Sequence, residues 1–120
     1  MANYKDLKVW QKAMDLVVDV YSVINDFPQI ERFALSDQIR RCSVSIPSNI
    51  AEGAGRNHTK EFVQFLSVSL GSLYELQTQL EIAKRVGYIT NTNIQELDKK
   101  TLEIEKMLNA LISSIKKGNQ

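Results

Sequence analysis

Basic side chains gather in the middle of the sequence, between residues 32 and 60, where they outnumber the acidic ones. Guanidinium and ammonium groups bind phosphate oxygens without regard to base sequence. A turn between two helices would present such groups to solvent. The sequence therefore predicts a nucleic-acid contact site made of Arg40, Arg41, Arg56, His58 and Lys60.

The same arginines have a structural alternative, because two acidic residues precede them at helical spacing. Asp37 lies four residues before Arg41, and Glu52 lies four residues before Arg56. An acid on the N-terminal side at this spacing is the favourable order for an ion pair on one helix. Both interpretations, phosphate contact and ion pairing within the fold, stay open at this point.

The residue types that catalysis or metal binding needs are scarce. The chain has one cysteine, Cys42, and one histidine, His58, which together cannot supply a closed zinc site. The Glu-x-x-His elements of di-iron bundles are absent from the sequence. A carboxylate pair from Glu52 and Glu75 is an acid–base candidate, but hydrogen bonds or ion pairs are the simpler expectation. We therefore predict no enzyme, no metal and no cofactor, with Cys42 as a small packing residue.

Length and composition indicate one globular domain over residues 1–120. The apolar content is 43%, the charged content is 24% and the net charge is +1, so no global field attracts nucleic acid or lipid. The N-terminal segment has no apolar run typical of a secretion signal, and no stretch is long enough to span a bilayer. A single cysteine suits a reducing compartment. We expect a cytoplasmic protein with no membrane partner.

Apolar spacing is helical throughout, and it predicts four helices at about 6–26, 36–53, 59–87 and 92–116. Four amphipathic helices with short connections favour an all-α, up-down-up-down four-helix bundle. In the first helix the expected core stripe is Leu7, Trp10, Met14, Val17, Tyr21 and Ile24. In the third it is Phe62, Leu66, Ser69, Leu73, Leu76 and Leu80, and in the fourth Leu97, Thr101, Ile104, Leu108, Leu111 and Ile115.

Capping residues predict where these helices begin and end. Ser36 and Thr59 are expected N-caps of the second and third helices, and Thr92 with Gln95 has the spacing of a capping box for the fourth. Gly53 and Gly55 are expected to close the second helix in the left-handed conformation, and Gly87 the third.

The second helix is unusual because it contains Pro47 and its back carries small residues. A proline inside a helix removes a hydrogen bond and kinks the helix, at a cost of about 3 kcal/mol. Close packing on two sides, once within the bundle and once against another subunit, would offset that cost. The alternative is a tolerated kink in a monomer. The predicted oligomer interface is Ser45, Pro47, Ser48, Asn49, Ala51, Glu52, Gly71 and Tyr74.

Two stretches carry a specific resemblance to a known family. They are residues 36–56, SDQIRRCSVSIPSNIAEGAGR, and residues 60–89, which include GSLYEL. The N-terminal segment KDLKVWQKAMDLVVDVY carries the same resemblance. The sequence resembles, over about residues 5–115, the four-helix-bundle proteins encoded by intervening sequences inside bacterial 23S ribosomal RNA genes. That resemblance implies a ring-shaped homopentamer with no established activity.

The family is also similar to the accessory variability proteins of diversity-generating retroelements. Those proteins are basic pentameric barrels that bind nucleic acid and a reverse transcriptase, whereas this chain has a net charge of only +1. Two hypotheses for the function follow. The first is a non-catalytic homo-oligomeric bundle that binds RNA or another nucleic acid through a basic patch repeated around a ring. The second is a structural scaffold for a protein partner, without nucleic-acid binding.

Overall fold

Four long helices, joined by turns, make up the computed structural model, which describes residues 3–118. No strand occurs within this range, so the predicted all-α class is confirmed. The four helices agree with the predicted spans to within a few residues at each end. Two short 3-10 helices precede α1 and α2, and the elements are η1 (Tyr4–Asp6), α1 (Lys8–Ile24), η2 (Gln29–Glu31), α2 (Leu35–Ala54), α3 (Thr59–Arg85) and α4 (Asn91–Gly118).

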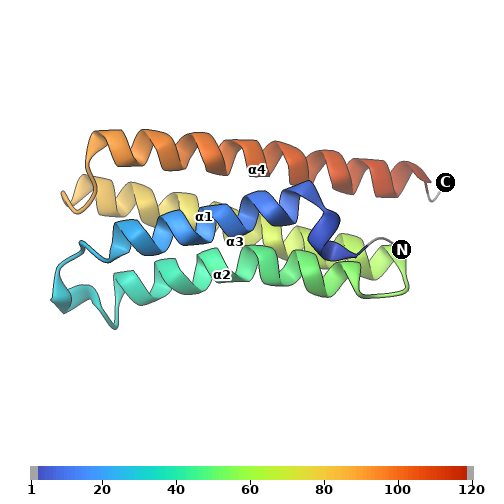
Figure 1. The fold of residues 1–120 in the computed structure, drawn as a ribbon, viewed down its shortest axis with the longest axis horizontal. Helices are drawn as coiled ribbons and strands as arrows, with labels where there is room; N and C mark the ends of the chain where they lie inside the picture. Colours follow the sequence, from blue (N-terminus) through green and yellow to red (C-terminus); the bar gives the residue numbers. More distant parts are fainter. Residues whose placement is uncertain (1–2, 119–120) are drawn as a thin grey trace.

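The chain reverses direction at each connection, so neighbouring helices run antiparallel in an elongated bundle (Figure 1). The principal extents are 48 × 24 × 20 Å. Each helix packs on two others: α2 contacts α1 and α3, and α4 contacts α1 and α3. The most extensive of these contacts joins α2 to α3. Both described ends of the chain lie at the end of the bundle where α2 passes into α3 (Figure 1).

The core is built from apolar stripes that repeat every three or four residues. The whole stripe predicted for α3, from Phe62 to Leu80, is buried. In α4, Leu97, Thr101, Ile104 and Leu108 are buried as predicted. Burial of each such large apolar side chain contributes about 1.5–3 kcal/mol relative to exposure.

In α1, Ile24 is buried as predicted, but the rest of the predicted core stripe is displaced by one residue from the buried one. Buried positions are Val9, Ala13, Leu16, Val20 and Ile24, whereas Met14 and Tyr21 are 40% and 43% exposed. The reason is that α1 carries two adjacent apolar stripes, and periodicity alone does not tell which one faces the core. The second stripe lies along the edge between α1 and α2.

Several predicted caps are wrong, because burial and turn geometry move the helix starts. Ser36 is buried within the first turn of α2, which begins at Leu35. The N-cap of α3 is His58, one residue before Thr59. The hydroxyl of Thr90, rather than that of Thr92, accepts a hydrogen bond from the backbone N–H of Asn93 at 3.2 Å.

Among the described glycines only Gly87 has a positive φ, at 86°. It follows the end of α3 as predicted, and the N–H of Tyr88 bonds to the carbonyl of Ala83 at 2.8 Å. The left-handed conformation predicted for Gly53 and Gly55 is wrong. Gly53 instead lets α2 approach α3, because a Cβ there would lie 2.7 Å from the Cβ of Phe65.

Pro47 lies inside a continuous α2 and is buried within the single chain. The hydroxyls of Ser45 and Ser72 meet at 2.8 Å and join α2 to α3, and Asn49 Nδ2 donates to the carbonyl of Ser45 at 2.8 Å. Small residues therefore let α2 pack between α1 and α3. This internal packing accounts for part of what the sequence assigned to a second subunit, and the kink at Pro47 remains a prediction.

The contact between α1 and α4 differs from that between α2 and α3, because ion pairs bridge it. Lys12 Nζ lies 2.8 Å from Glu103 Oε1, and Lys100 pairs with Asp19. The pairing with Glu103 raises the pKa of Lys12, first through the hydrogen bond and then through charge. All four side chains are partly exposed to water. Exposed pairs of this kind contribute about 0–1 kcal/mol each.

Candidate nucleic-acid interface

The structure divides the predicted nucleic-acid site into two parts. Arg40 and Arg41 lie in the first half of α2, and Arg56 follows its C-terminal end. At 1.5 Å per residue, the separation of Arg40 and Arg56 along the bundle is about 24 Å. His58 and Lys60 lie near Arg56, in the turn before α3 and in its first turn. One continuous patch of all five residues on a single chain is therefore not formed.

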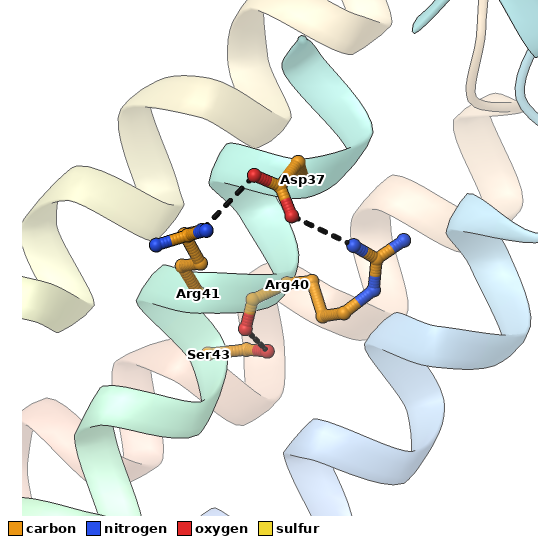
Figure 2. Close-up of polar contacts among 4 residues, drawn as sticks. All are labelled: Asp37, Arg40, Arg41 and Ser43. Carbon is orange, nitrogen blue, oxygen red and sulfur yellow. Dashed lines mark hydrogen bonds and ion pairs between the residues drawn. The ribbon is translucent and has the colours of Figure 1, made fainter. Parts of the chain in front are cut away.

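At the first part, Asp37 bridges both arginines. Arg40 Nη1 lies 3.0 Å from Asp37 Oδ1, and Arg41 Nε lies 2.9 Å from Asp37 Oδ2. Figure 2 shows the two guanidinium groups on opposite sides of the carboxylate. The predicted pairing of Asp37 with Arg41 is confirmed, and the structure adds Arg40 to it. Sequence spacing could have indicated the second pair, since Arg40 lies three residues after Asp37.

At the second part, the predicted pair of Glu52 and Arg56 is present at 3.4 Å. The Arg56 guanidinium also lies 5.1 Å from the centroid of the Phe65 ring. His58 and Lys60 are exposed, and neither side chain forms a hydrogen bond or ion pair within residues 3–118. These two side chains are available to an anion from solvent.

The fold brings further basic residues to this same end of the bundle. Lys5 and Lys8 lie where the chain enters α1, and Lys116 and Lys117 lie in the last turn of α4 (Figure 1). We call this set the basic end: Lys5, Lys8, Arg56, His58, Lys60, Lys116 and Lys117. The acidic residues of the same terminal turns are Asp6, Glu52 and Glu61. Sequence reasoning missed Lys5 and Lys8, because only the antiparallel topology places them beside the turn between α2 and α3.

Cys42 is buried and its thiol donates to Glu75 Oε2 at 3.2 Å across the contact between α2 and α3. Burial, followed by the hydrogen bond to Glu75, raises the pKa of the thiol to about 11. A reactive cysteine has a lowered pKa, so this environment opposes nucleophilic chemistry. Within residues 3–118, no group of three or more His, Cys, Asp and Glu side chains could hold a metal ion.

The residues predicted for an oligomer interface also lie in different places. Ser45, Pro47 and Asn49 take part in packing inside the chain. Ser48 and Ala51 line a groove between α1 and α2 together with Trp10, Met14, Val17 and Val44. The groove has a volume of about 370 Å³. It is the largely apolar surface that the second stripe of α1 forms.

On α3, Gly71 and Tyr74 face outward. A Cβ at Gly71 would meet no atom within 4 Å in the chain itself. The Tyr74 hydroxyl donates weakly to Glu105 at 3.4 Å, and Tyr74 is 44% exposed. Glu52, the remaining predicted interface residue, is engaged by Arg56.

Comparison with known proteins establishes the family. The profile of the 23S rRNA-intervening sequence protein family matches residues 5–110. The chain belongs to this family. The motif-rich stretches of α2 and α3, on which the sequence resemblance rests, lie inside the matched range. No curated protein matches the chain.

A solved structure supports the fold of this family member. It is similar to a crystal structure of a protein of unknown function from the S23 ribosomal protein family of Bacteroides thetaiotaomicron VPI-5482. The TM-score is 0.81 at 26% sequence identity, over 88% of this chain and 95% of that one. The family and the solved relative thus share a helical fold without an assigned activity. Within the described residues, no helix of this chain is both long and apolar enough to cross a membrane.

Proposed function

We propose that this family member is a non-catalytic homo-oligomer that binds RNA through its basic end. The observation that carries the proposal is the convergence of exposed basic side chains at one end of the bundle, from η1, α1, α3, α4 and the turn between α2 and α3. The side chains of His58 and Lys60 have no partner among the described residues, and Lys5, Lys8, Lys116 and Lys117 form no ion pair there. Phosphate groups are the anions that such a dispersed set of cations binds best.

Assembly into a ring would strengthen this binding. In a cyclic oligomer every subunit is related to the next by rotation about one axis, so all basic ends lie at the same height. Their potentials add, and the local attraction for a polyanion exceeds what the net charge of one chain suggests. A ring of five copies is the expectation from the family resemblance. A single unpaired cysteine supports a reducing, cytoplasmic location as part of the proposal.

The scaffold function is the second candidate, and a different observation favours it. Arg40, Arg41 and Arg56 are already engaged by carboxylates of the same chain. The groove between α1 and α2 offers apolar surface at Met14 and Val44, which are 40% and 39% exposed. Surface of this kind suits a protein partner or a second copy.

Sedimentation with a labelled structured RNA, at low and at moderate salt, tests the proposal. We expect the wild-type oligomer to carry the RNA with it at low salt and to lose most of it at moderate salt, because phosphate contacts release counterions. The double variant Arg56→Gln, Lys60→Gln is expected to lower the affinity at low salt by about tenfold.

The matched control removes the same charge from the opposite end of the bundle, with Lys84→Gln and Lys99→Gln. Both lysines are exposed and lie far from the basic end along the helices. The control should change the affinity by less than about twofold. Equal losses in the two double variants would reject the basic end as the site. An RNA that stays unbound at both salts would reject RNA binding and leave the scaffold function.

Gly71→Leu tests the proposed assembly. In an isolated chain the substitution replaces a poor helix former without any clash, so the helix becomes more stable by about 1 kcal/mol. At an interface where another backbone approaches, the leucine side chain would prevent contact. We expect sedimentation velocity to show a smaller species with unchanged helicity. Asn109→Leu, on the exposed surface of α4, is the control; an unchanged species for Gly71→Leu would remove α3 from the interface.

A further inference from the structure

A cavity lies at the opposite end of the bundle from the basic end. It has a volume of about 560 Å³ and lies between the C-terminal part of α1, the loop before α2 and the first turns of α2. We call it the loop cavity. Its volume falls within the range of about 300–1,000 Å³ that small-molecule sites occupy. The described residues that line it include Arg32 and Arg40 but no aspartate or glutamate.

Both arginines at the cavity have free donors, but only Arg40 is held by a carboxylate, and Arg32 is exposed. Arg40 is fixed by Asp37 through Nη1 alone, and its guanidinium lies 5.8 Å from the centroid of the Tyr21 ring. Arg32 lies 5.3 Å from the centroid of the Phe33 ring and forms no ion pair within residues 3–118. A guanidinium group positioned in advance, as that of Arg40 is, loses less conformational freedom when it binds an oxyanion.

Ser36 contributes a hydroxyl to the wall of the cavity. This residue lines the cavity and is only 4% exposed. Its hydroxyl forms no hydrogen bond with any residue that the structure describes. The hydroxyl is therefore free to donate to, or to accept from, a group that enters the cavity.

The remaining walls favour a flat, polar-edged group over an aliphatic one. Tyr21 contributes an aromatic ring that is 43% exposed, and the buried Phe27 ring also lines the cavity. Aromatic faces bind bases by stacking. Asn25 contributes an amide, which both donates and accepts, as the edges of bases do.

We propose that the loop cavity binds one unpaired nucleotide, with its phosphate on Arg32 and Arg40 and its base against Tyr21. The inference rests on the proposed RNA binding and deepens it: the basic end holds RNA by charge, and the loop cavity selects single-stranded over double-stranded RNA. A base within a duplex is stacked and paired, so it cannot enter the cavity. Free AMP and a nucleotide within an RNA strand present the same chemistry.

The test compares three probes: AMP, a short single-stranded RNA and an RNA duplex of matched length. The cavity variants are Arg32→Gln, which alters an exposed side chain, and Ser36→Ala, which removes a hydroxyl from the cavity wall. Tyr21→Leu keeps the apolar surface but removes the ring. We expect each variant to weaken single-strand binding by about fivefold or more and to leave duplex binding unchanged.

The basic-end variant Arg56→Gln, Lys60→Gln separates the two proposals, because it should weaken both RNA probes alike. If all three cavity variants bind the single strand with the affinity of the wild type, the cavity assignment is overturned. The proposal for the basic end is not affected by that result. If the wild type binds neither RNA, the result with AMP tests the cavity. Binding of AMP by the wild type and its loss in Ser36→Ala would support a site for a free nucleotide. A wild type that does not bind AMP would overturn the inference. Competition by a polyglutamate peptide equal to that by AMP would show a general anion site and also overturn it.

Discussion

Gly53→Ala is expected to lower the free energy of unfolding by about 1–3 kcal/mol, the range for overpacking a close contact. The added Cβ would lie 2.7 Å from the Cβ of Phe65 and 3.3 Å from the carbonyl oxygen of Phe62. Neither atom can rotate away, because both are fixed by the backbone of α3. Alanine favours a helix by about 1 kcal/mol over glycine, so the clash must exceed that gain.

Gly55→Ala is the matched control, only two residues away. A Cβ at Gly55 meets its nearest atoms at 3.5 and 3.6 Å, and the φ of −78° suits any residue. This variant should be neutral or more stable by about 0.4–1 kcal/mol, because the unfolded chain loses freedom. Urea unfolding followed by circular dichroism, at one protein concentration for all samples, measures both. Equal stability of the two variants would mean that α2 and α3 do not approach as closely as described.

Cys42 in the folded protein is expected to react with iodoacetamide at pH 8 about a hundredfold more slowly than in the unfolded chain. Its pKa is about 11 instead of 9.0, because the thiol is buried and donates to Glu75. The thiolate is the reacting species, and at pH 8 its fraction falls by about tenfold for each unit that the pKa rises. Mass spectrometry of the alkylated chain over time, with and without urea, gives the two rates.

The raised pKa of Cys42 also sets the direction of a pH effect. The folded state holds the thiol proton more tightly than the unfolded state. The contribution to stability is therefore complete below about pH 9 and is lost as the pH rises toward 11. Cys42→Ser removes the titrating thiol and should flatten this part of the stability profile. Equal alkylation rates in the folded and unfolded chains would contradict the buried environment of Cys42.

Much of the fold could be predicted because helical periodicity is strong in α3 and α4. The stripe from Phe62 to Leu80 faces the core, as its spacing indicates. The stripe of α1 could not be assigned, since Val9 and Trp10 begin two equally regular patterns. Which of them is buried depends on how α2 packs beside α1, and that is a tertiary property.

The contacts of the candidate site could be predicted only where the two partners are close in sequence. Ion pairs four residues apart, such as Glu52 with Arg56, follow from helical geometry alone. The basic end does not, because Lys5 and Lys117 are at opposite ends of the sequence, and only the topology brings them to the same end of the bundle. The role of Gly53 was misread for a similar reason: a glycine near a helix end suggests a turn, whereas the close approach of Phe65 is visible only in space.

The contacts between helices in the bundle differ in strength, and this difference affects where the native state opens first. The contact of α2 with α3 is the most extensive and includes one buried and one partly buried serine hydrogen bond, whereas water-exposed ion pairs bridge α1 and α4. Salt screens such pairs but leaves apolar packing intact. We therefore expect fluctuations of the native state to begin where α1 contacts α4, and the amide protons of α2 and α3 to be the last to exchange. The helices that carry the family motifs are thus also those that hold the fold longest.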